Sequence, residues 1–272
     1  MSARLFSFGL ASLGLALLGG HARAQVNGFA INRFEPAERG SDWQVNESLD
    51  FRGTLRPAVG LIVDWAYRPL VLRVPSTTGA ETERAVLVDQ IFVHAGGSLV
   101  FRDRLRVAVD LPVALFQDGE DGGGARAPTT AAVGDARLSG DVRLVGAYGA
   151  PFSLALGARA YFPTGSRAAF TSDGTLRLAP HVLVAGNIVG GIPYAAQLGF
   201  SYRPLDARFE DRRLGSEAFF SVAIGVKAND RFIFGPELSG STVVGKDPPF
   251  RVRNTPLELI LGAHVTLGSH WQ

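Results

Sequence analysis

The chain has 272 residues and no cysteine, which excludes a disulfide framework and thiol chemistry. Its 27 basic and 25 acidic side chains are mixed along the chain, and two of the basic ones lie among the first 24 residues. This balance argues against a nucleic-acid partner, because nucleic-acid binding normally needs a clustered basic face.

Residues 1–24 have the pattern of a secretory signal peptide. Arg4 precedes an apolar run from Leu5 to Leu18, and the small-residue motif "ARA" ends at Ala24. The run is shorter than the roughly 20 residues that a membrane-spanning helix needs, so cleavage after Ala24 is favoured over a membrane anchor. We therefore expect an exported protein that begins near Gln25.

Residues 25–52 are charged and irregular and precede the regular part of the chain. Three interpretations remain open for this N-terminal segment. It is a periplasmic lead-in, a plug inside the structure that follows, or an additional pair of strands.

Ten segments with alternating apolar and polar residues come next. In "RLRVAVDLPVALF", for example, Leu105, Val107 and Val109 share one parity, and Arg106 and Asp110 share the other. Such alternation is typical of β-strands, whose successive side chains point to opposite faces, and the many internal glycines disfavour helices. The predicted strands cover 53–67, 86–101, 104–117, 134–148, 152–164, 176–188, 192–204, 216–228, 231–243 and 254–267.

The links between these segments alternate in length. The short ones read "RDR", "GAP", "VGGI" and "ANDR", and the long ones cover 68–85, 118–133, 165–175, 205–215 and 244–253. This alternation is typical of bacterial outer-membrane barrels, which have short periplasmic turns and long extracellular loops. We therefore predict an all-β protein: a closed up-and-down antiparallel transmembrane β-barrel over 53–268. It has about ten strands, with twelve as the alternative, and we expect it in the outer membrane with both termini in the periplasm.

Aromatic residues gather near the expected strand ends, whereas the strand centres hold mostly aliphatic residues and glycine. Aromatic rings prefer the membrane–water boundary, so two such bands predict two interfacial belts. The predicted belt residues are Trp65, Tyr67, Phe116, Phe162, Tyr202 and Phe220 at the long-loop end, and Tyr148, Phe152, Tyr194 and Phe232 at the short-turn end.

The polar parity of the predicted strands carries charges of both signs, which we assign to the lumen of the barrel. A ten-stranded barrel is near the small end of the range, so many long side chains would leave it plugged or narrow. The candidate lumen-lining residues are Arg56, Asp64, Arg106, Asp110, Arg137, Asp141, Arg143, Arg159, Arg177, His181, Gln197, Arg203, Glu217, Lys227, Glu237, Glu258 and His264.

Several stretches together resemble the N-terminal barrel region of bacterial OmpA-family outer-membrane proteins: "FAINRFEPAERGSDW", "LRPAVGLIVDWAYRPLVL", "DLPVALFQDGED", "YFPTGSR" and "GPELSGSTVV". The resemblance covers about residues 28–267 and implies a membrane barrel, but it identifies no site. Proteins of this family often continue into a peptidoglycan-binding domain. The sequence has no such domain before its last residue, Gln272, so we do not expect cell-wall anchoring.

No motif predicts catalysis. "GSTVVGKD" approaches a phosphate-binding loop, but Asp247 replaces the hydroxyl residue that would hold magnesium, and His94 and His181 lie in mid-strand rather than at a rim. We expect no enzyme, no cofactor and no metal site. The expected function is structural, or passive diffusion of small solutes through a narrow pore, with outer-membrane lipid as the partner. A surface-display or adhesion barrel with no open pore is the alternative, and an outer-membrane enzyme is less favoured. Solute specificity and oligomeric state stay open.

Overall fold

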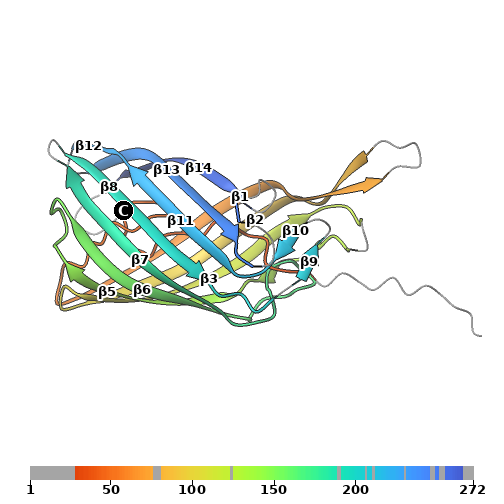
Figure 1. Cartoon of the computed structure of the whole chain (residues 1–272), viewed down its shortest axis with the longest axis horizontal. Helices are drawn as coiled ribbons and strands as arrows, with labels where there is room; N and C mark the ends of the chain where they lie inside the picture. Colours follow the sequence, from red (N-terminus) through yellow and green to blue (C-terminus); the bar gives the residue numbers. More distant parts are fainter. Residues whose placement is uncertain are drawn as a thin grey trace, which may run out of the picture.

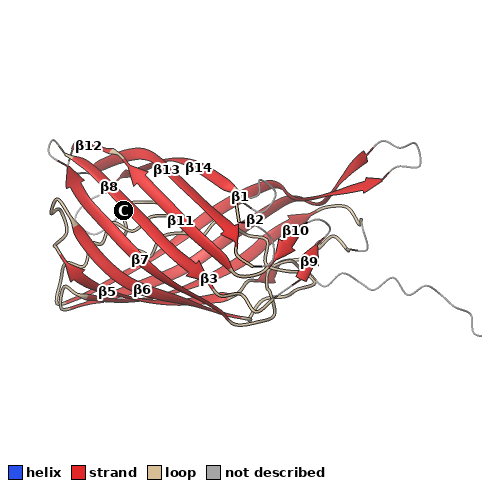
Figure 2. Ribbon diagram, viewed as in Figure 1, coloured by secondary structure: helices blue, strands red, loops and turns tan. Residues whose placement is uncertain are grey.

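The computed structural model describes residues 28–75, 81–122, 125–188, 191–205, 207–209, 212–229, 231–245, 249–250 and 255–265. These residues contain strands, turns and loops and no helix (Figure 1, Figure 2). The strands are β1 (Leu55–Pro75), β2 (Glu81–Phe101), β3 (Leu105–Asp118), β4 (Ala132–Val133), β5 (Ala136–Val145), β6 (Ser153–Phe162), β7 (Arg177–Ile188), β8 (Ile192–Ser201), β9 (Ala207–Phe209), β10 (Arg212–Leu214), β11 (Glu217–Ile224), β12 (Val226–Asn229), β13 (Phe232–Val243) and β14 (Leu257–Val265).

Antiparallel pairing follows the chain order. The main sheet runs β1-β2-β3-β5-β6-β7-β8-β11-β13, β14 pairs with β13, and β12 continues β11 beyond Gly225. The sheet therefore has ten long strands, each corresponding to one predicted segment, and it curls around an interior (Figure 1). Between its edge strands β1 and β14, no pairing is found among the described residues. The prediction of an all-β, antiparallel fold with ten strands is confirmed.

The tight turns fit the sequence that forms them. Arg102 and Asp103 link β2 to β3 and both have positive φ angles, 47° and 56°, as a type I′ hairpin turn requires. The turn closes with a hydrogen bond from the Arg104 amide to the Phe101 carbonyl at 3.0 Å. Short turns of this kind gather at one end of the sheet, which we call the short-turn end, and the opposite end is the long-loop end.

The predicted link over 68–85 is mostly strand instead of loop. β1 and β2 remain paired as far as Pro75 and Glu81, after register shifts on either side of Leu70. Beyond that bulge, Leu72 and Leu87 are buried in an apolar cluster that also contains loop residues such as Phe29 and Phe170. The two strands project past the others as one hairpin (Figure 1), and the predicted link over 205–215 contains the small β9–β10 hairpin.

The two faces of the sheet are opposite in polarity to those of an ordinary water-soluble sheet. Outward-facing aliphatic side chains are open, with Val59 85% and Leu261 81% exposed. Inward-facing charged side chains are covered, with Arg106 3% and Asp141 2% exposed. Because successive side chains of a strand point to opposite faces, the alternating apolar residues face outward and the polar residues between them face inward.

Candidate functional site

Residues 28–54 occupy the interior of the curled sheet, and we call them the plug segment (Figure 1). At the long-loop end, the Ile31 amide donates to the Phe170 carbonyl at 3.2 Å. At the short-turn end, the Gly53 amide donates to Asp103 Oδ1 at 2.7 Å, just before β1 begins. The plug segment therefore runs the length of the interior, from the long-loop end to the short-turn end.

A single carboxylate of the wall binds the middle of the plug segment. Glu237 on β13, 2% exposed, accepts hydrogen bonds from the backbone amides of Gln44, Val45 and Asn46 at 2.6, 3.0 and 2.9 Å. The Asn46 side-chain amide adds a fourth at 3.0 Å. Converging backbone N–H groups form a concave anion site, so this contact fixes the backbone of the plug segment by charge-assisted hydrogen bonds.

Next to this contact lies a buried ion network. Arg106 on β3 reaches Glu47 of the plug segment and Asp141 on β5, each at 2.7 Å. Arg106 and Asp141 are also direct cross-strand partners, so the sheet register itself sets their pairing. His181 on β7 approaches the other oxygen of Asp141 at 2.9 Å. Gly157 separates Asp141 from His181 in the sheet, and a Cβ there would lie 2.0 Å from Asp141 Oδ1, so the network requires a glycine.

A second network lies against β1, β2 and β3. Arg39 of the plug segment pairs with Asp110 at 2.8 Å and donates to the His94 carbonyl at 2.9 Å. The His94 ring stands between two carboxylates, with Asp110 3.0 Å from Nδ1 and Asp64 3.0 Å from Nε2. The Arg39 side chain crosses above Gly96, where a Cβ would lie 2.8 Å from its Cζ atom. Small residues on the inner face thus make room for an arginine of the plug segment.

A third set of contacts joins the plug segment to β5 and β6. Arg137 pairs with Glu35 at 3.2 Å and with Glu38 at 3.3 Å. The Tyr161 hydroxyl donates to Glu35 at 2.6 Å, and the Ser139 hydroxyl donates to Glu38. The acidic residues of the plug segment therefore complement the basic residues of the wall.

At the short-turn end, Asp50 anchors the last turn of the plug segment. Arg52 and Arg56 contact its carboxylate at 2.8 and 2.9 Å. Burial alone would raise the pKa of Asp50, but the hydrogen bonds from Arg52 and the charge of Arg56 outweigh it and hold the pKa below its ordinary value. The Arg52 guanidinium also lies 4.1 Å from the centre of the Tyr148 ring. Burial, reinforced by the nearby Asp42 carboxylate, raises the pKa of Tyr148.

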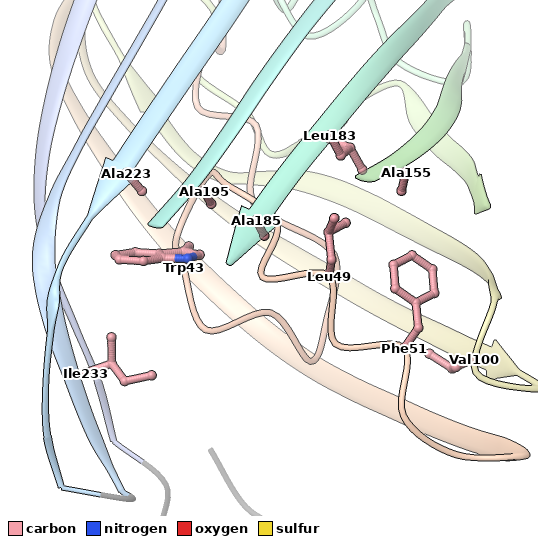
Figure 3. Packing of buried hydrophobic residues seen from close by; sticks show 10 residues of the cluster. All are labelled: Trp43, Leu49, Phe51, Val100, Ala155, Leu183, Ala185, Ala195, Ala223 and Ile233. Carbon is pink, nitrogen blue, oxygen red and sulfur yellow. The ribbon is translucent and has the colours of Figure 1, made fainter. Parts of the chain in front are cut away.

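Apolar side chains of the plug segment fill part of the interior and pack against the wall. Trp43, Leu49 and Phe51 point from the plug segment towards small and branched side chains of the wall (Figure 3). Leu49 and Phe51 are fully buried. One cavity of about 150 Å³ lies near the long-loop end, and another of about 100 Å³, which Trp43 lines, lies at the short-turn end.

The predicted lumen residues occupy the inward-facing positions of the strands and differ in how deeply they are buried. Most are buried and contact the plug segment or one another. The buried ones are Arg106, Asp110, Arg137, Asp141, Arg159, His181, Gln197, Arg203 and Glu237. Others are half-buried: Arg56, Asp64, Arg143, Arg177, Glu217, Glu258 and His264. Lys227 is exposed, because it lies in β12 at the short-turn end, where all four residues of the strand are open.

The predicted belt residues also differ in their solvent exposure. Those with the most open rings are Trp65, Tyr67, Phe116, Phe152, Phe162 and Tyr202, while Phe220, Tyr148, Tyr194 and Phe232 are half-buried. Tyr148 differs from a lipid-facing belt residue, because its hydroxyl donates to Asp42 of the plug segment at 2.8 Å.

The residues of the plug segment that bind the wall were not among the predicted site residues. They are chiefly Glu35, Glu38, Arg39, Glu47 and Asp50. Their signal in the sequence is the density of charges over 35–52 without strand periodicity, which shows a non-strand segment but not its partners.

Among the described residues, no group of three or more histidine and acidic side chains is arranged to hold a metal ion. The same residues include no helix that is long and apolar enough to cross a membrane. In the sequence "GSTVVGKD", the first four residues lie in β13, and Lys246 and Asp247 fall outside the described residues.

Comparison with protein-family models gives no matching family, and comparison with curated proteins gives no significant relative.

Proposed function

We propose that the protein is an integral outer-membrane β-barrel whose lumen is closed by its own plug segment. The observation that carries the proposal is the inverted polarity of the sheet. An exposed apolar face spread over all the long strands would be a severe aggregation hazard in water, but it matches the hydrocarbon of a bilayer. The charged face, in turn, needs the plug segment and its ion pairs, because buried charges without partners are costly.

The proposal includes closure of the sheet by pairing β14 with β1. The two strands run in opposite directions, since β1 leaves the short-turn end and β14 returns to it. A membrane sheet cannot leave an open edge, because unpaired backbone groups in hydrocarbon cost several kcal/mol each. The plug segment also touches both edges: Arg39 donates to the Gly60 carbonyl on β1 at 3.2 Å, and Gln44 packs against Gly262 on β14.

The outer membrane is the compartment that best fits this architecture. The signal peptide predicted over residues 1–24, which lie outside the described residues, favours it, as do the absence of cysteine and the alternating short and long links. In this orientation the short-turn end faces the periplasm, and the long-loop end, with the projecting β1–β2 hairpin, faces the exterior. The OmpA-like resemblance of the sequence supports the same assignment.

The plug segment implies a structural role or, at most, slow passive diffusion of small solutes. The Trp43 cluster and the Glu237 contact lie between the two cavities, so solutes need the plug segment to move before they can pass. No described cluster suggests catalysis, and we propose a non-enzymatic protein. A surface-display role is the second candidate, because the β1–β2 hairpin extends beyond the rest of the sheet (Figure 1).

Membrane fractionation and planar-bilayer recordings test the proposal together. The full-length protein should fractionate with outer membranes, resist extraction by alkaline carbonate, and show little or no conductance when reconstituted. A Trp43→Ala variant should conduct measurably more, because it opens a gap between the two cavities. Trp65→Ala, which removes an exposed outer tryptophan, is the matched control and should behave like the unaltered protein.

Recovery of the protein in the soluble fraction would contradict the membrane assignment. Large conductance of the unaltered protein would contradict closure by the plug segment.

A further inference from the structure

The cavity of about 150 Å³ near the long-loop end has an unusual lining, and we call it the vestibule cavity. Arg33 borders it from the plug segment, Arg159 from β6, and Glu217 and Glu258 from β11 and β14. Phe219 adds an apolar side. One water needs roughly 10–15 Å³ on this measure, so the space suits a small organic molecule as well as solvent.

Two arginines of this cavity, Arg33 and Arg159, are paired less closely with carboxylates than Arg177 and Arg203, which also line it. Arg159 is 5% exposed; among the described residues its side chain donates to Gln197 at 3.2 Å and lies 3.8 Å from Glu47. Its Nε atom is buried without a hydrogen-bond partner in the described part of the chain, a feature it shares with Arg56, Arg137 and Arg177, so the distance to its nearest carboxylate is what sets Arg159 apart. Arg33 makes no ion pair with any described residue, and burial lowers its pKa even though Glu217 and Glu258 oppose the shift.

Three arginines elsewhere in the interior lie closer to carboxylates. Arg39, Arg106 and Arg137 each have a carboxylate within 3.3 Å. A buried guanidinium with unused donors is costly, and an anionic ligand would satisfy it. Carboxylate is the natural complement, because its two oxygens match the fork of guanidinium donors.

We infer that the vestibule cavity binds a small monocarboxylate, whose carboxylate is held by Arg33 and Arg159 and whose short alkyl part packs against Phe219. Glu217 and Glu258 set the selectivity, because they repel a second negative charge on the ligand. A dicarboxylate of similar size should therefore bind more weakly. This inference goes beyond the proposed function and does not depend on it, since binding can be measured on detergent-solubilised protein.

Isothermal titration calorimetry on the purified full-length protein in detergent tests the inference. Sodium butyrate should bind, whereas butyramide, which has the same shape without the charge, and disodium succinate should each bind at least tenfold more weakly. Arg159→Gln and Arg33→Gln should each weaken butyrate binding at least tenfold. Arg143→Gln removes an interior arginine that lies 5.9 Å from the Phe51 ring centre, away from the cavity, and it should leave binding unchanged.

Circular dichroism identifies variants that keep the β-sheet signal, and Arg33→Gln serves as the second variant if Arg159→Gln does not fold. Absence of butyrate binding to the folded protein would overturn the inference. So would equal binding of butyrate and butyramide, or an equal loss in Arg143→Gln, because the effect would then not come from a carboxylate at these two arginines.

Discussion

Glu237 binds Asn46 twice through one carboxylate oxygen, which accepts the backbone amide at 2.9 Å and the side-chain amide at 3.0 Å. The two residues are 191 positions apart in the chain. This contact ties the plug segment to β13 at mid-depth, where both residues are buried. Among the described residues, no other side chain of the wall accepts as many hydrogen bonds from the plug backbone as Glu237 does.

Replacing Glu237 with glutamine should loosen the plug segment. The amide has one acceptor oxygen and turns an NH₂ group towards backbone donors, so part of the contact becomes repulsive. Hydrogen exchange measured by mass spectrometry should be at least tenfold faster over residues 44–46. The control is Glu258→Gln on the neighbouring β14, which should leave exchange over 44–46 as it is. Equal exchange in wild type and Glu237→Gln would mean that other contacts hold the plug segment.

Removing Arg106 should destabilise the folded protein strongly. Arg106→Ala leaves Glu47 and Asp141 buried without their main counter-charge, and breaking a buried ion pair in this way costs about 3–5 kcal/mol. The midpoint of guanidinium-induced unfolding in detergent should fall accordingly. Arg143→Ala, which removes a half-buried interior arginine without an ion pair in the described residues, should shift the midpoint much less. A small shift for Arg106→Ala would show that water replaces the arginine.

Closure of the sheet predicts that β1 and β14 can be cross-linked. The chain has no cysteine, so two introduced cysteines have no native thiol with which to form a competing disulfide. Cysteine at outward-facing Leu61, combined in turn with cysteine at Leu259 and at Leu261, should form a disulfide on mild oxidation in at least one pair. The pair Leu61 and Leu198, on β1 and β8, is the control and should stay reduced. Failure of every β1–β14 pair would favour an open sheet.

Acid should weaken the attachment of the plug segment at the short-turn end. The pKa of Asp50 is depressed in the folded protein, so its ion pairs contribute stability above the unfolded pKa of about 4. That contribution is lost as pH falls through the lower, folded pKa. The stability difference between wild type and Asp50→Asn should be largest above pH 5 and shrink below pH 4. A difference that stays constant down to the acid limit would argue against a titrating Asp50.

The path of the plug segment predicts the side on which its first residues lie. Gly28 accepts a hydrogen bond from Arg167 in a long loop at 2.8 Å, and Gln25 is only three residues before it. A cysteine at Val26 should therefore react with a membrane-impermeant maleimide on whole cells, as should one at Asp121 in a long loop. A cysteine at Gly149, in a short turn, should react only after the outer membrane is opened. Protection of Val26 together with Gly149 would support the expectation that both termini are periplasmic.

The sequence alone determined the strands and the polarity of their faces. Alternation of residues such as Val107 and Arg106 has a period of two, and this local pattern depends only on the geometry of an extended chain. The tight turns could also be predicted from the local sequence, since residues such as Asp103 tolerate positive φ angles. The continuation of β1 and β2 to Pro75 and Glu81 was missed, because its apolar residues are covered by Phe170 and Leu205, which are distant in sequence.

Only the tertiary structure decided what fills the interior. The charges of Glu47 and Arg106 are visible in the sequence, but their 2.7 Å contact joins residues 59 positions apart. No periodicity encodes the partner of an irregular segment, because its path depends on the shape and charge of the surface that receives it. The same reason explains Arg159 and Arg33. The long distance between Arg159 and its nearest carboxylate, and the absence of an ion pair of Arg33 among the described residues, appear only when the whole wall and the plug segment are in place.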